Sequence, residues 1–231
     1  VDKTVKKIQE IRKKNNFGIK IIKNKINKGS GYCRRIGIKK AKGFYLAFLD
    51  SDDYWLNNKL SDQLYFINNN PNIKFTYSDF LKESFYKNKF YFFQIKTPIK
   101  VSIDENKYIN NIPNSSVLIS ADLVKEIKYP KQRLRNDFIF WNKILSTNKK
   151  AITAYNFNPG KPYFVYGLNK GISSNKFKLI FNQWGLYRRV FKYSYVESIY
   201  GIILNIKTYL FRNLIIRIFK KSILNNELNH K

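Results

Sequence analysis

The protein is a chain of 231 residues that is strongly basic and rich in apolar side chains. Its 44 Lys and Arg residues outnumber 15 Asp and Glu residues, so the formal net charge is +29, while 44% of the residues are hydrophobic and 17% are aromatic. Such an apolar content excludes a disordered basic tail. The length fits one large domain, or one domain with a small appendage.

The basic excess has two alternative explanations. Lys, Asn, Ile, Phe and Tyr are all abundant, and AT-rich codons encode all of them, so a coding bias alone can raise the Lys content. The other explanation is an anionic partner, because net charge reports on solubility and association rather than on fold.

The chain contains one cysteine, Cys33, and one histidine, His230. A single cysteine cannot form an internal disulfide, which fits a reducing compartment. A single histidine argues against a histidine-based triad and against a His/Cys zinc site. Acid–base chemistry therefore falls to carboxylates, Tyr or Lys.

The first part of the chain alternates predicted helices and strands. Residues 44–49 are six apolar residues in a row between Gly43 and Asp50, which is typical of a buried parallel strand. This alternation indicates an α/β fold. In chain order we expect a helix around 5–11, a strand at 19–22, a helix at 32–42, the strand at 44–49 and a helix around 60–67.

The pattern continues with shorter elements and then changes. We expect a strand at 73–77, an edge hairpin or insertion at 85–93, a strand at 116–119, and helices at 122–127 and 137–145. After about residue 175, helical segments dominate, with Lys and Arg between apolar residues. The sequence thus predicts a domain over 1–176 and a basic amphipathic helical tail over 177–231.

An acidic cluster, Asp50, Asp52 and Asp53, follows the predicted strand at 44–49. In open α/β sheets, ligands gather at the carboxyl ends of strands. Carboxylates this close repel one another unless a cation lies between them, and Mg²⁺ or Mn²⁺ takes carboxylates together with substrate phosphates. The alternative is a solvated turn that caps the next helix.

The residues around this cluster form an ordered pattern. It consists of Asn27-Lys28-Gly29, then Arg34 with Gly37, then Ala41-Lys42-Gly43, an apolar strand and Leu49-Asp50-Ser51-Asp52-Asp53. This pattern resembles the signature of glycosyltransferase family 2, the nucleotide-sugar-dependent enzymes of GT-A type. Segments 75–79, 114–119 and 136–141 resemble further motifs in the same order, so the resemblance covers roughly residues 2–176.

The resemblance implies a GT-A (Rossmann-like) mixed sheet flanked by helices and an inverting sugar transfer. The donor is a nucleotide sugar, the acceptor is a saccharide or a lipid-linked molecule, and the expected process is cell-surface polysaccharide synthesis. It further implies that Asp52 and Asp50 hold Mn²⁺ or Mg²⁺ on the donor diphosphate. The resemblance also implies that Arg34 and Asp53, together with Asp50 and Asp52, bind the nucleotide sugar.

On the acceptor side, the resemblance implies that Asp137 is the catalytic base. The alternative for Asp137 is a helix N-cap. Trp141 and Ser115 are expected near the acceptor, with a place in the core as the alternative for Trp141.

The sequence departs from the family pattern at several positions. Gly167 and Asn169 stand where the family has Arg and His, so a catalytically impaired relative is a competing hypothesis. Asp2-Lys3-Thr4 resembles the end of the family's first acidic turn. We therefore expect an N-terminally incomplete catalytic domain, whose first strand, first helix and second strand would precede Val1.

The tail has two readings as well. Lys207, Arg212 and Arg217 interrupt its apolar runs, so no stretch of ~20 apolar residues is available to span a membrane. It either covers the sheet or lies on an anionic membrane surface. We expect the membrane, with the protein in the cytoplasm on the inner face of the cell membrane. A nucleic-acid-binding protein is the alternative, but the basic residues are dispersed and no nucleic acid is expected as a partner.

Overall fold

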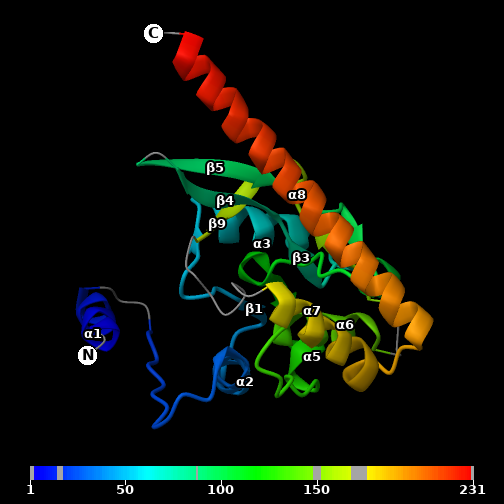
Figure 1. Ribbon diagram of the computed structural model, residues 1–231. Helices are drawn as coiled ribbons and strands as arrows, with labels where there is room; N and C mark the ends of the chain where they lie inside the picture. Colours follow the sequence, from blue (N-terminus) through cyan, green and yellow to red (C-terminus); the bar gives the residue numbers. More distant parts are fainter. Residues whose placement is uncertain (1–2, 15–17, 87, 148–151, 168–175, 230–231) are drawn as a thin grey trace.

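In the computed structural model, two β-sheets are surrounded by helices, and a long C-terminal helix runs past them (Figure 1). The structure describes residues 3–14, 18–86, 88–147, 152–167 and 176–229. The strands are β1 (Tyr45–Ala47), β2 (Tyr54–Trp55), β3 (Phe75–Tyr77), β4 (Asp79–Tyr86), β5 (Lys89–Ile95), β6 (Lys100–Val101), β7 (Leu118–Ser120), β8 (Ala154–Asn156) and β9 (Pro162–Tyr166).

Helices flank both sheets and make up the C-terminal part. They are α1 (Thr4–Lys14), α2 (Ser30–Lys40), α3 (Lys59–Asn69), α4 (Ile103–Asn106), the 3₁₀ turn η1 (Asn114–Ser116), α5 (Ala121–Lys125), α6 (Asn136–Leu145), α7 (Lys176–Gly185), the π-helical turn η3 (Leu186–Val190) and α8 (Tyr195–Asn229).

The larger sheet has the strand order β1-β7-β3-β8-β6. β7 pairs antiparallel with both β1 and β3, and β3 pairs parallel with β8. The main core lies against this sheet and includes Phe75, Tyr77 and Ile119, together with Phe140 and Trp141 of α6, all fully buried.

The smaller sheet has the order β2-β9-β4-β5. β4 and β5 form the hairpin that the sequence predicts as an edge element, and β9 pairs parallel with β4 and antiparallel with β2. β2 begins directly after the acidic cluster. The end of β9 is therefore brought next to the site that the sequence predicts.

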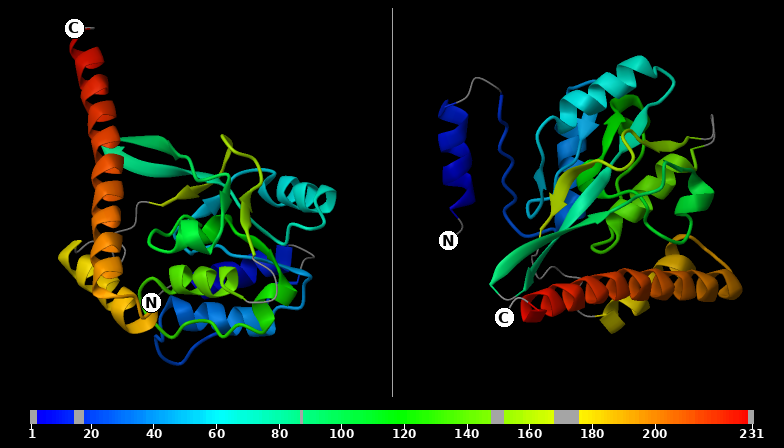
Figure 2. Two further views of the ribbon diagram at one scale, coloured as in Figure 1. Left: turned by 90° about the vertical axis from the view of Figure 1, so that its right-hand side faces the viewer. Right: turned by 90° about the horizontal axis from the view of Figure 1, so that it is seen from above.

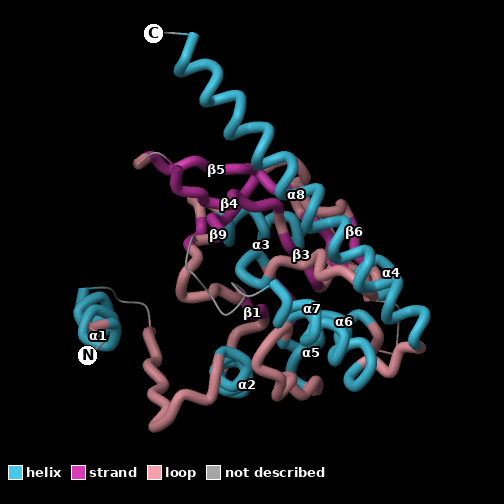
Figure 3. The backbone as a smooth tube through the Cα atoms, viewed as in Figure 1, coloured by secondary structure: helices cyan, strands magenta, loops and turns pink. Residues whose placement is uncertain are grey.

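Two strand predictions are wrong in detail. Residues 19–22 form no strand but part of an extended loop beside α1, away from both sheets (Figure 3). Residues 44–49 form only a three-residue strand, β1, which pairs antiparallel rather than parallel. Within the run, Leu46 and Phe48 face the core, whereas Ala47 and Leu49 on the opposite face are exposed. Phe44, which precedes the strand, is 89% exposed.

The helix predicted around 60–67 from the apolar residues Leu60, Leu64 and Ile67 is confirmed as α3, but of these three residues only Ile67 is buried. Lys59, Gln63 and Ile67 point inward, whereas Leu60 and Leu64 are each 37% exposed. Gln63 donates hydrogen bonds to the Thr76 hydroxyl and to the Ser116 carbonyl, both at 3.0 Å. These bonds satisfy the hydrogen-bonding groups of the Gln63 amide nitrogen, so a polar side chain can be buried at a position where the periodicity predicts an exposed one.

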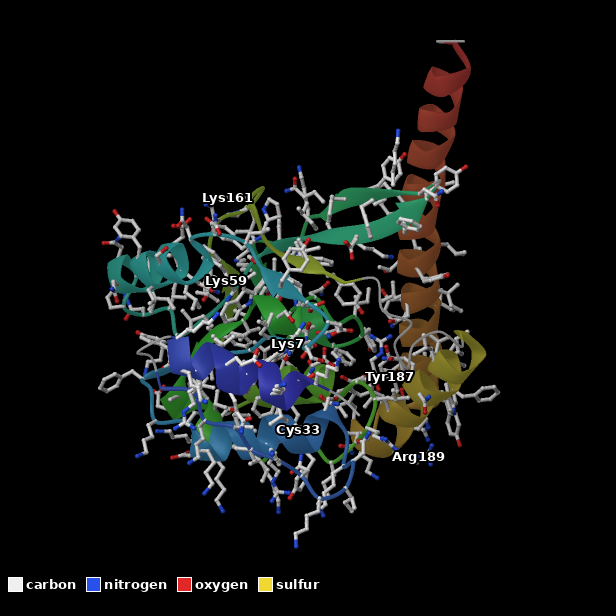
Figure 4. All side chains as sticks on the ribbon, turned by 90° about the vertical axis from the view of Figure 1, so that its left-hand side faces the viewer. Lys7, Cys33, Lys59, Lys161, Tyr187 and Arg189 are labelled. Atoms are coloured by element: carbon white, nitrogen blue, oxygen red, sulfur yellow. The ribbon has the colours of Figure 1, made fainter. Side chains whose placement is uncertain are left out.

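The C-terminal part joins the body through a cluster of tyrosines. Tyr187 of η3 and Tyr193 stack with ring centroids 5.7 Å apart, and Tyr108 meets both rings edge-on. Figure 4 shows Tyr187 at the point where the η3 turn meets α8. Gly201 of α8 lies against Tyr108 and Tyr187, because a Cβ there would come within 2.8 Å of both rings.

Beyond this junction, α8 runs past the body and its C-terminal end projects (Figures 1 and 2). Large apolar side chains remain exposed along the helix, from 51% to 77%, at Val196, Ile199, Ile203, Leu210 and Leu214. Among the described residues, no helix combines the length and the apolar character needed to cross a membrane.

Candidate active site

The acidic cluster forms a closed turn between β1 and β2. The Asp53 amide donates to the Asp50 carbonyl at 3.1 Å. Ser115 of η1 stabilises the turn with two hydrogen bonds. Its hydroxyl donates to Asp53 Oδ2 at 2.5 Å and accepts from the backbone amide of Asp50 at 3.0 Å. The turn does not cap the next helix, because Asn58 occupies the N-cap position of α3.

Arg34 of α2 joins this turn to the start of α6. Its Nη2 forms an ion pair with Asp50, and its Nη1 donates to Asn136 and, at 3.3 Å, to the Tyr129 hydroxyl. Burial alone would lower the pKa of Arg34, but Tyr129 and Asp50 more than offset this, so the pKa lies above its ordinary value. Three segments distant in sequence therefore meet at one charged group.

Asp137 lies in the first turn of α6 and is half-buried. The N-cap position belongs to Arg135, which has a left-handed backbone, and no side-chain capping bond is formed. The N-cap alternative for Asp137 is therefore wrong. Its Oδ2 accepts a hydrogen bond from the Asn110 side chain at 2.9 Å.

Asp52 and Asp53 have different environments. Asp53 Oδ1 accepts from the Gly167 amide at 3.1 Å, and burial raises the pKa of Asp53 although the Ser115 and Gly167 bonds lower it. Asp52 is exposed, and none of the described residues donates a hydrogen bond to its carboxylate. Asp52 is thus the acid in the turn that is open to a ligand.

The turn fits a divalent cation that arrives with a diphosphate. Among the described residues, no three carboxylate, His or Cys side chains form a cation cage. Mg²⁺ instead commonly uses one or two carboxylates together with substrate phosphates. Asp52 supplies an open carboxylate, whereas Asp50 Oδ1 is shared by Arg34 and by Asn114, at 2.9 Å from the Asn114 amide nitrogen.

Two acceptor-side predictions need correction. Trp141 is fully buried and packs on Phe48 and Phe75 with ring centroids 5.3 Å away in each case. It is a core residue and cannot stack on a sugar. Ser115 is 1% exposed and supports the acidic turn rather than facing an acceptor.

Several site residues were missed by sequence reasoning. Asn110 and Asn114 each donate to a carboxylate of the site, and Tyr129 contacts Arg34. Asn136, which begins the motif predicted at 136–141, accepts from Arg34 and from the Tyr129 hydroxyl. Asparagines are abundant in this chain, so nothing in the sequence separates these from the others. Asn169 lies outside the described residues.

Comparison with known proteins identifies the family. The sequence model described as "Glycosyl transferase family 2" matches residues 1–141. The chain belongs to glycosyltransferase family 2. The family 2 match spans the loop before α2, the acidic turn and α6 up to Trp141, and therefore contains every residue of the site except Gly167.

Curated relatives of this family 2 chain include two bacterial glycosyltransferases. WfaP of Escherichia coli, a UDP-Glc:alpha-D-GlcNAc-diphosphoundecaprenol beta-1,3-glucosyltransferase, is 35% identical over 70% of the chain. TuaG of Bacillus subtilis, a putative teichuronic acid biosynthesis glycosyltransferase, is 32% identical over 74% of the chain. The chain spans 61% and 66% of the lengths of these two relatives.

Solved structures confirm the predicted fold class. TarS of S. aureus, residues 1–349, in complex with UDP-GlcNAc has a TM-score of 0.57 at 20% identity, covering 74% of this chain and 48% of that one. The same fragment in complex with UDP has a TM-score of 0.56 at 21% identity, over 72% of this chain and 48% of that one. The family 2 chain thus has the GT-A arrangement of mixed sheets flanked by helices.

Proposed function

We propose that this protein is an inverting glycosyltransferase, which moves a sugar from a nucleotide-sugar donor to a hydroxyl group of a saccharide or lipid-linked acceptor. The observation that carries the proposal is the Arg34 bridge between Asp50 and Asn136. It joins an acidic turn with one open carboxylate to the residue next to Asp137. In this proposal the acidic turn binds the donor phosphates, and Asp137 acts as the proton acceptor of the same site.

On the donor side, Asp52, with Asp50, would hold Mn²⁺ or Mg²⁺ against the donor diphosphate. When bound, such an ion stabilises the charge that develops on the leaving diphosphate. Arg34 contributes a permanent positive charge on the nucleotide side. Asp53, fixed by Ser115 and Gly167, keeps the turn in shape.

On the acceptor side, Asp137 takes the proton of the attacking hydroxyl group. A single displacement at the anomeric carbon needs one base on the face opposite the leaving group, which inverts the configuration. Asp137 suits this role because it is half-buried at the start of α6 and its Oδ2 is oriented by Asn110.

We propose that the substrates are those that the relatives' names suggest. WfaP uses UDP-glucose and an undecaprenol-linked acceptor, and TuaG is assigned to teichuronic acid biosynthesis. We therefore expect a nucleotide-sugar donor such as UDP-glucose, a lipid-linked or saccharide acceptor, and a role in cell-surface polysaccharide synthesis.

We also propose that the chain divides into a catalytic domain over 1–176 and a tail over 177–231 that binds an anionic membrane. The supporting observation is the row of exposed apolar side chains on α8, beside basic residues such as Lys207. Such a surface suits the headgroup region of a bilayer. This would hold the protein in the cytoplasm on the inner face of the membrane, next to a lipid-linked acceptor.

The test is incubation of the protein with UDP-glucose, Mn²⁺ and GlcNAc-diphosphoundecaprenol, followed by NMR of the product. A β-linked product from the α-linked donor supports inversion. Retained α-configuration contradicts the mechanism. UDP binding without any transfer, across a panel of UDP-sugars, would favour the competing hypothesis of a catalytically impaired relative.

A further inference from the structure

The loop over residues 107–111 links the C-terminal helix to Asp137. It follows α4 and carries Asn110, whose amide nitrogen lies 2.9 Å from Asp137 Oδ2. The amide oxygen of Asn110 is buried and has no hydrogen-bond partner. A carboxylate only accepts hydrogen bonds, so Asp137 fixes which end of the amide faces it. The hydrogen bond to Asp137 is thus the interaction that orients the Asn110 side chain.

The same loop is held from the other side by η3 and α8. The Tyr108 carbonyl accepts from the Tyr187 hydroxyl at 2.5 Å and from the Asn205 amide at 2.9 Å. Lys107 pairs with Glu197 of α8 at 2.8 Å, and the Lys107 carbonyl accepts from the Tyr193 hydroxyl at 3.2 Å. Two consecutive residues of the loop are therefore anchored to the C-terminal part.

A third anchor ties the loop to α4 and, through Asn106, to α6. The backbone amide of Asn111 donates to the side-chain oxygen of Asn106 at 2.9 Å, and the side-chain amide of Asn111 donates to the Glu105 carbonyl at 2.7 Å. Asn106 in turn donates to Asn142 of α6 at 3.4 Å. Asn110 thus lies between fixed neighbours, and its amide has little freedom to turn away from Asp137.

We propose that Asn110 is a positioning residue for Asp137 and that the docked α8 keeps it in place through Tyr108. This inference rests on the proposed function. In the reaction, the acceptor O–H bond breaks and its oxygen bonds to the anomeric carbon. The bond from that carbon to the diphosphate oxygen breaks, and its electron pair leaves with the diphosphate. The proton of the broken O–H bond goes to the Asp137 carboxylate, which Asn110 holds in place through Oδ2.

The experiment compares the full chain with Asn110→Ala, Asn110→Asp and Asn205→Ala, using UDP-glucose and GlcNAc-diphosphoundecaprenol. We expect kcat to fall at least about tenfold for both Asn110 variants, with the donor KM within about twofold of the wild-type value. Asn205→Ala should lower kcat by a smaller factor, again with the donor KM close to the wild-type value. Thr208→Ala is the matched control, because the Thr208 hydroxyl donates to the Leu204 carbonyl within α8 and, among the described residues, to no residue of the loop.

Two outcomes separate failure of this inference from failure of the proposed function. A wild-type kcat in folded Asn110→Asp, while Asp137→Asn is inactive, would overturn the inference alone. Full activity in Asp137→Asn would overturn the proposed function and the inference together. If Asn110→Ala does not fold, Asn110→Asp, which preserves the side-chain shape, decides the question. A wild-type kcat in Asn205→Ala would overturn the contribution of α8.

Discussion

Gly167 lies so close to the backbone of Asp52 that no other residue fits there. A Cβ at position 167 would lie 1.9 Å from the Asp52 carbonyl oxygen. The Gly167 amide also donates to Asp53. The end of β9 and the acidic turn are therefore in direct backbone contact, and a glycine at position 167 is a structural requirement of the site.

This contact predicts that Gly167→Ala displaces the acidic turn. We expect a loss of UDP affinity of at least about tenfold, measured by calorimetry, because Asp52 and Asp53 would move apart from β9. Gly167→Arg, which introduces the residue that the resemblance leads us to expect at this position, should be as harmful. Gly37→Ala is the control, since a Cβ there meets nothing within 4 Å. Tighter UDP binding by Gly167→Arg would contradict this interpretation.

Lys59 predicts a particular dependence of stability on pH. It is 2% exposed, lies over the Trp55 ring at 4.4 Å, and donates to Gln63 (Figure 4). Burial lowers the pKa of Lys59 to about 7, from an ordinary value near 10.5. Between these values the unfolded chain binds more protons than the folded protein, so the stability contribution of this site rises with pH.

The measurement is urea unfolding of wild type and Lys59→Met from pH 6.5 to 10. Wild type should gain roughly a few kcal/mol relative to Lys59→Met across this range. Exposed Lys39→Met is the control and should follow wild type. Parallel curves for wild type and Lys59→Met would show that Lys59 does not titrate in this window.

The buried position of Trp141 predicts a stability effect without an acceptor effect. Trp141→Ala should lower the free energy of unfolding by about 3–5 kcal/mol, because it leaves a cavity between Phe48 and Phe75. The milder Trp141→Phe should leave the acceptor KM unchanged. An acceptor KM raised several-fold in stable Trp141→Phe would restore the sugar-stacking hypothesis.

The exposed face of α8 predicts binding to anionic vesicles. Wild type should float with vesicles containing phosphatidylglycerol and less with pure phosphatidylcholine, with binding that weakens as salt rises. Replacing Ile199, Ile203 and Leu210 by Gln should reduce flotation several-fold. Tyr65→Gln is the control, because Tyr65 is 74% exposed on α3. Equal recovery on both vesicles would contradict the electrostatic part of the proposal.

The sequence predicts the acidic turn and the helix at Asp137 because both depend on local order. The acidic turn directly follows the apolar run, as predicted, although β1 is shorter than the predicted strand and pairs antiparallel. The pairing itself could not be predicted, since it depends on β7, more than seventy residues later. Apolar periodicity also failed for α3, where hydrogen bonds to Thr76 and Ser116 favour burial of Gln63.

The polar network of the site could not be predicted for a similar reason. Asn110 contacts Asp137, Asn114 contacts Asp50 and Asn136 contacts Arg34. Each of these contacts joins parts of the chain that are distant in sequence, so it arises only in the folded protein. The core position of Trp141 likewise depends on Phe48 and Phe75. Long-range contacts, rather than residue types, decide both.

The role of Asp137 as the base of a sugar transfer beside the Arg34–Asp50 pair has one most direct test. It is the turnover of UDP-glucose with GlcNAc-diphosphoundecaprenol by Asp137→Asn, with UDP affinity measured on the same sample. We expect turnover to fall by about 10²–10⁴-fold while UDP affinity stays at the wild-type value. Wild-type turnover by Asp137→Asn would contradict the role of Asp137 as the base.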